Sequence, residues 1–67
     1  MAEFYVEITA QGNGDHLVHK ADCSLLPAKN AIHYLGAISN SDSALKKAGG
    51  VYRQVNGCSQ CVTARAA

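Results

Sequence analysis

The sequence predicts a small α+β domain in which an antiparallel β-hairpin and a third strand pack against one helix and a zinc ion stabilises the fold. Three observations lead to this prediction: strict apolar–polar alternation near the N-terminus, a capped helical segment in the second half, and two pairs of metal-ligating residues. The 67 residues predict a single domain, residues 1–67. A core this small contributes little stability, so a metal, disulfides or a partner chain should assist it.

The first two strands are predicted from alternation and a turn. Residues 3–9 place Phe4, Val6 and Ile8 on one side and polar residues together with Tyr5 on the other, as in a half-buried strand. The Gly-, Asn- and Asp-rich residues 11–15 then predict a turn. The second strand of the hairpin is expected at residues 16–20.

A loop, the third strand and a helix follow. Pro27 predicts an irregular loop over residues 25–30, and the third strand fits residues 31–37. Ser39 and Asp42 have the spacing of a capping box, which predicts a helix over residues 40–48.

The end of this helix and the segment after it complete the prediction. An apolar stripe of Ala44, Leu45 and Ala48 should face the sheet, and Gly49-Gly50 should end the helix in the left-handed conformation. Residues 51–55 should be extended, and Asn56-Gly57 should turn the chain into Cys58.

The residues that carry chemistry form two pairs. Cys58 and Cys61 make a C-x2-C motif, in which a tight turn aims both sulfurs at one point. His19 and Cys23 make an H-x3-C pair at the end of the second predicted strand. Three thiolates and one imidazole fill the tetrahedral coordination sphere that Zn²⁺ prefers. We therefore expect one structural zinc ion, bound by His19, Cys23, Cys58 and Cys61.

Other interpretations of these residues exist. The four could be a core histidine and three buried thiols without metal, and His16 could replace His19 as the imidazole ligand. The C-x2-C motif could be a redox pair, but a thioredoxin-type motif belongs to a larger α/β unit. A thiol enzyme would require a cysteine that is free of metal and has a lowered pKa.

Composition restricts the surroundings and partners of the protein. No secretory signal is recognisable, three cysteines are an odd number for a disulfide framework, and no apolar run approaches the ~20 residues of a membrane span. We expect a cytoplasmic protein without membrane contact. Six Lys or Arg residues against five Asp or Glu residues give no strong attraction to nucleic acid.

The segment from residue 19 to residue 61 resembles the zinc-binding domain of the Ada DNA-repair protein and the small bacterial domains similar to it. The matching stretches are "VHKADCSLLP", "IHYLG", "SNSDSALKKAGG" and "NGCSQC", which together span about two thirds of the chain. The resemblance implies an α+β fold in which the metal clamps the hairpin to the C-terminal end. It also implies that the chain is a small stand-alone relative of this family.

One departure from the family affects function. In the repair protein all four ligands are cysteines, and the first one accepts a methyl group from DNA; His19 stands at that position here. A zinc-bound imidazole has no lone pair left to attack, so methyl transfer is not expected. We expect a structural module that is not an enzyme and that contacts a protein partner, through its strand edges or the strand face carrying Tyr5, Glu7 and Thr9. The alternative is a DNA-binding module without methyl-transfer activity.

Overall fold

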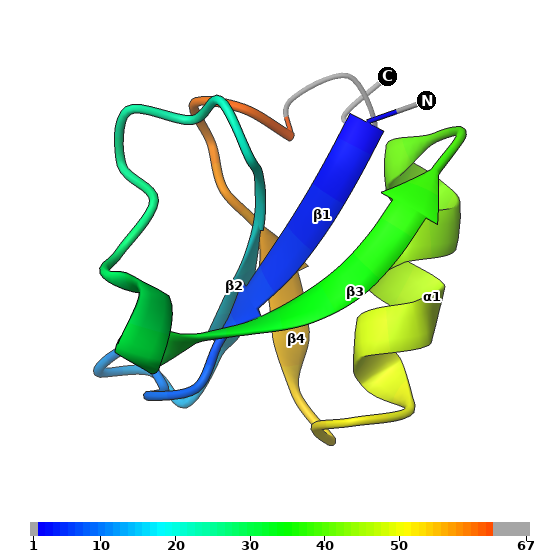
Figure 1. Ribbon diagram of the computed structural model, residues 1–67. Helices are drawn as coiled ribbons and strands as arrows, with labels where there is room; N and C mark the ends of the chain where they lie inside the picture. The colour runs from blue at the N-terminus through cyan, green and yellow to red at the C-terminus, as the bar shows by residue number, and fades with distance from the viewer. Residues whose placement is uncertain (1, 63–67) are drawn as a thin grey trace.

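A four-stranded mixed sheet with one helix packed against it forms the domain (Figure 1). The computed structural model describes residues 2–62. Its elements in chain order are β1 (Ala2–Glu7), β2 (His16–Lys20), the 3-10 helix η1 (Lys29–Ala31), β3 (Ile32–Ile38), α1 (Ser41–Gly49) and β4 (Val55–Gly57). The strands lie in the order β3-β1-β2-β4, and the predicted α+β class is confirmed.

The predicted hairpin is present, but its first strand is shorter than alternation suggests. β1 pairs antiparallel with β2, with Tyr5 opposite His19 and Val6 opposite Val18. β1 ends at Glu7, and Ile8 is 45% exposed, so Ile8 is not the core residue that the alternation predicted. The N–H of Ile8 still donates to the carbonyl of Ala31 at 2.9 Å, and the turn to β2 follows between Gln11 and Asp15.

A fourth strand, β4, begins at Val55 and includes Asn56-Gly57, where the sequence predicted a turn, whereas residues 51–54, which were predicted to be extended, form no strand. Residues 55–57 pair in parallel with β2, with Val55 opposite His16 and Gly57 opposite Val18. The backbone N–H of Cys58 then donates to the carbonyl of Val18 at 3.0 Å. Three residues are too few to show a strand period, so only the pairing with β2 defines this strand.

Both ends of α1 differ in detail from the prediction. The helix is capped by Asn40, whose side-chain oxygen accepts a hydrogen bond from the N–H of Ser43 at 2.8 Å, and not by the predicted Ser39–Asp42 box. The chain also leaves the helix without a left-handed residue, since φ of Gly50 is −81°. Asn and Ser are comparable caps, so spacing alone identified the wrong one of two neighbours.

The core lies between the sheet and α1 and extends to the C-terminal turn. Its buried members are Phe4, Val6, Val18, Leu35, Ala44, Ala48, Cys58 and Val62. The predicted helix stripe is confirmed, because Ala44 and Ala48 are buried and Leu45 packs against the core. Cys58 belongs to this core, so the candidate site and the hydrophobic interior are continuous.

Gly36 accommodates an irregularity that we expect to be sensitive to substitution. β1 pairs with β3 through Phe4–Gly36 and then Tyr5–Tyr34, which leaves one extra residue in β3, and φ of Gly36 is 123°. A side chain is strained at this φ, so Gly36→Ala should lower the free energy of unfolding by about 1–3 kcal/mol in urea titrations. Gly12→Ala is the control, because a Cβ there meets no atom within 4 Å. Equal effects of the two substitutions would contradict the prediction.

Candidate metal centre

The four predicted ligands come together at the end of β2. One potential ligand atom from each of His19, Cys23, Cys58 and Cys61 lies within 4.8 Å of all the others. His19 is in β2 and Cys23 lies in the turn directly after it, whereas Cys58 and Cys61 flank the turn after β4. The parallel pairing of β4 with β2 brings the Cys58–Cys61 pair next to the His19–Cys23 pair.

The distances between these atoms suit a tetrahedral metal ion. The sulfurs of Cys23 and Cys58 are 3.9 Å apart, and the sulfur of Cys61 is 3.9 Å from Nδ1 of His19. With Zn–S bonds of about 2.3 Å and Zn–N bonds of about 2.0–2.1 Å, the edges of a tetrahedron are roughly 3.8 Å for S···S and 3.6 Å for S···N. These two distances match the edges of the tetrahedron to within a few tenths of an ångström, and the other pairs lie within 4.8 Å.

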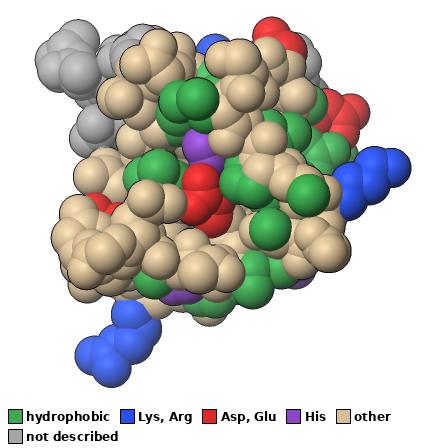
Figure 2. Space-filling view, turned by 90° about the vertical axis from the view of Figure 1, so that its left-hand side faces the viewer, with side chains coloured by type: hydrophobic (Ala, Val, Ile, Leu, Met, Phe, Trp, Pro, Cys, Tyr) green, Lys and Arg blue, Asp and Glu red, His purple; other side chains and the backbone are tan. Residues whose placement is uncertain are grey.

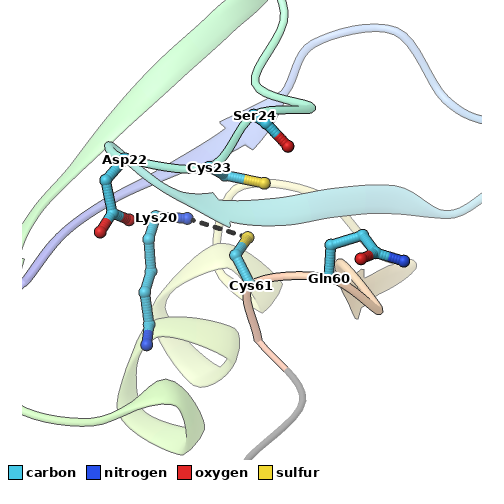
Figure 3. A pocket seen from close by; sticks show the side chains of 6 residues that line it. All are labelled: Lys20, Asp22, Cys23, Ser24, Gln60 and Cys61. Carbon is cyan, nitrogen blue, oxygen red and sulfur yellow. Dashed lines mark hydrogen bonds between the residues drawn. The ribbon is translucent and has the colours of Figure 1, made fainter.

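Backbone N–H groups support two of the sulfurs. The N–H of Lys20 donates to the sulfur of Cys61, and the N–H of Gln60 donates to the sulfur of Cys58, each at 3.4 Å. Figure 3 shows the first of these bonds and the sulfurs of Cys23 and Cys61 directed into a shared hollow. Such bonds stabilise negative charge on sulfur, as a site for thiolate ligands requires.

The local environment shifts the pKa values of the two thiols of the C-x2-C motif in opposite directions. Burial raises the pKa of the Cys58 thiol, but hydrogen bonds from the N–H groups of Gln60 and Cys61 and from the neighbouring thiols outweigh it and lower that pKa to about 7. Burial and a hydrogen bond with Cys23 raise the pKa of the Cys61 thiol to about 12. Cys58 is thus the more readily deprotonated thiol of the C-x2-C motif.

The two sides of the cluster differ in exposure. His19 and Cys58 are buried at 1% and 2% exposure, whereas Cys23 and Cys61 are half-buried. The hollow beside the two half-buried thiols is lined by Lys20, Asp22, Cys23, Ser24, Gln60 and Cys61 (Figure 3). A metal ion has a direct path to the cluster from this side.

Sequence reasoning missed Glu7. Alternation placed Glu7 on an outer strand face as part of a contact surface, but the residue is only 9% exposed. Its Oε2 lies 2.6 Å from Nε2 of His19, and its Oε1 accepts a hydrogen bond from Nε2 of Gln11 at 2.6 Å. Only the pairing of β1 with β2 could have indicated this contact, because the two residues are 12 positions apart.

The other histidines lie outside the cluster. Nδ1 of His16 is 2.9 Å from the backbone oxygen of Glu7, and its ring stacks on Tyr52 with centroids 3.8 Å apart. His33 is exposed on β3. His19 is therefore the histidine that the structure brings to the three cysteines.

Comparison with known proteins identified no relative of this chain. No family model matches the chain, and no match was found among curated proteins or among solved structures. Within residues 2–62, no helix combines the length and apolar character needed to cross a membrane. The fold and the cluster define a small α+β domain whose His/Cys3 group is compatible with a metal-binding module.

Proposed function

We propose that this domain binds one Zn²⁺ ion through Nδ1 of His19 and the sulfurs of Cys23, Cys58 and Cys61, and that the ion has a structural role. The observation that carries the proposal is the convergence of four ligand atoms from two distant chain segments within 4.8 Å. Ligand spacing and the order of the elements support a relation to the Ada-type zinc-binding domains. The ion would tie the end of β2 to the turn after β4.

The donor set favours zinc and a non-catalytic role. Thiolate and imidazole ligands in tetrahedral geometry suit Zn²⁺ better than Mg²⁺, Ca²⁺ or Mn²⁺, which prefer oxygen ligands. Four protein ligands leave no open position for water or substrate, whereas catalytic zinc sites keep one. We accordingly propose that the domain is not an enzyme.

Metal analysis tests the proposal directly. Protein purified without added metal should contain one equivalent of zinc by mass spectrometry. Its cobalt-substituted form should show the ligand-field absorption of a tetrahedral thiolate site. His19→Ala should weaken or abolish binding, and His33→Ala, which changes an exposed histidine, should leave one equivalent bound. A folded protein that holds no metal would contradict the proposal.

Zinc affinity should rise with pH. Thiols must lose their protons to bind zinc. Without metal, Cys61 is protonated at neutral pH both in the folded cluster, where its pKa is about 12, and in an unfolded chain, where a thiol has a pKa of about 8.5. Binding therefore releases at least one proton, so the apparent affinity should increase at least about tenfold per unit between pH 7 and 8. Below pH 7 the dependence should be at least as steep, because Cys58, with a pKa of about 7 in the folded cluster, is then protonated too. Competition with a chromophoric chelator measures this slope, and a pH-independent affinity would contradict the assignment of thiolate ligands.

The edge position of β3 among the described strands supports a role in protein interaction. β3 is the outermost strand on one side of the sheet, and a mainly apolar hollow beside it is lined by Tyr5, Ala21, Leu26, Pro27, Lys29, Ile32 and Tyr34. An extended segment of a partner protein could pair with β3 and place an apolar side chain in this hollow. Glu7 does not take part in such a surface, since it is buried against His19.

Peptide selection can test this surface. Peptides selected on immobilised zinc-loaded protein should be extended and apolar, and Tyr34→Glu should abolish their binding. Val51→Glu is the matched control, because Val51 is an exposed apolar residue outside that hollow. Equal binding to both variants would contradict a partner at β3. Sedimentation analysis of the protein alone would show whether a second copy occupies the edge instead.

DNA binding stays a prediction drawn from the family resemblance. On the face shown in Figure 2, the Lys and Arg side chains lie apart at the margins and form no patch. A DNA-binding module should be retained on a DNA matrix at low salt and released steeply as salt increases. Lack of retention at low salt would exclude this alternative.

A further inference from the structure

A buried carboxylate lies directly behind the histidine of the cluster. Oε2 of Glu7 is 2.6 Å from Nε2 of His19, and the His19 side chain is 1% exposed. On the other side of the same ring, Nδ1 lies 3.9 Å from the sulfur of Cys61. The imidazole thus connects a carboxylate on one edge with the thiol cluster on the other.

Glu7 does not belong to the ligand set. The group of potential ligand atoms that lie within 4.8 Å of one another contains His19 and the three cysteines, without the Glu7 carboxylate. Its two oxygens are used by His19 and by Gln11 instead.

We propose that Glu7 is a positioning residue that holds His19 with its Nε2–H toward the carboxylate and its Nδ1 lone pair toward the metal. This inference rests on the proposed zinc site. A neutral imidazole carries a proton on only one nitrogen, so donation from Nε2 to Glu7 leaves Nδ1 free as the ligand atom. The negative charge of the carboxylate also makes the imidazole a stronger electron donor.

Glu7 is itself held in place. Nε2 of Gln11 donates to Oε1 at 2.6 Å, and the backbone oxygen of Glu7 lies 2.9 Å from Nδ1 of His16, which stacks on Tyr52. The carboxylate and the backbone of Glu7 are therefore fixed by groups from the turn after β1 and from β2. In the folded domain this fixed acceptor restricts the His19 ring to the orientation in which Nδ1 faces the cysteine sulfurs.

Substitution of Glu7 should weaken zinc binding in a graded way. Glu7→Ala removes the acceptor and should lower zinc affinity roughly 10- to 100-fold in competition with a chelator of known affinity. Glu7→Gln keeps an oxygen that can accept from Nε2 but removes the charge, so its affinity should fall between those of Glu7→Ala and the unchanged protein. Glu3→Ala is the matched control, because Glu3 is an exposed carboxylate on the same strand.

Nuclear magnetic resonance of the cadmium-113 form gives a readout that does not depend on affinity. In the unchanged protein, cadmium should couple to Nδ1 of His19, and the Nε2–H proton should exchange slowly with water. In Glu7→Ala this proton should exchange faster while the cysteine couplings persist. Cadmium coupling to Nε2, or unaltered affinity and proton exchange in Glu7→Ala, would overturn the role of Glu7. Failure of the unchanged protein to bind zinc or cadmium would instead overturn the proposed metal site.

Discussion

Removal of zinc should unfold the domain. Within residues 2–62, eight residues form the buried core and two of them are alanines, which leaves little apolar surface to stabilise the fold. Structural zinc in small domains contributes about 10–16 kcal/mol of apparent binding energy at neutral pH, which exceeds what such a core supplies. A strong chelator should therefore collapse the dispersed NMR spectrum, and zinc in excess should restore it.

A ligand variant and a neighbouring control make this test specific. Cys61→Ser removes one ligand at a half-buried position, so it should cause unfolding at chelator concentrations that the unchanged protein resists. Ser59→Ala changes an exposed residue in the same turn and should behave like the unchanged protein. An intact, dispersed spectrum after complete zinc removal would show that the core alone is sufficient.

Phe4→Ala should be the most destabilising substitution away from the metal cluster. Phe4 is 1% exposed and is the largest fully buried side chain. Truncation of a buried Phe to Ala costs about 3–5 kcal/mol, through lost burial and the cavity that remains. We expect a loss of this size in the free energy of unfolding of the zinc-loaded protein, measured by urea titration at a fixed free zinc concentration, because bound zinc adds to apparent stability.

Leu25→Ala is the control for this measurement. Leu25 is 55% exposed, so its truncation should change the free energy of unfolding by no more than about 0.5 kcal/mol. If Phe4→Ala changed the free energy of unfolding as little as Leu25→Ala does, the core would not be the assembly of β1, β2, β3 and α1 described above.

The parts of the fold that sequence patterns predicted are those governed by local rules. Alternation from Phe4 to Val6, turn-forming residues 11–15 and the Ala44–Ala48 stripe each identify an element from neighbouring residues alone. The predicted ends of the elements were less accurate. The sequence predicted Ser39 as the helix cap, but Asn40 caps the helix in the structure, because both residue types can cap and spacing does not distinguish two neighbours.

The candidate site was likewise predictable only in part. The local spacings H-x3-C and C-x2-C predicted the ligand set, because the two members of each pair are only a few residues apart. The set is His19, Cys23, Cys58 and Cys61. Their convergence depends on β4, of which the sequence predicted only Val55 to be extended and residues 56–57 to be a turn. A strand of three residues is recognisable only from its partner, and here the partner is β2.

The fold class, the hairpin, the helix and the four clustered residues could therefore be predicted from local patterns in the chain. The parallel pairing of β4 with β2, the Asn40 cap and the inward position of Glu7 against His19 are visible only in the folded domain. The difference lies in the distance along the chain over which each interaction acts. Propensity and periodicity act over a few residues, whereas the contact of Glu7 with His19 depends on strand register across 12 positions, which no local pattern encodes.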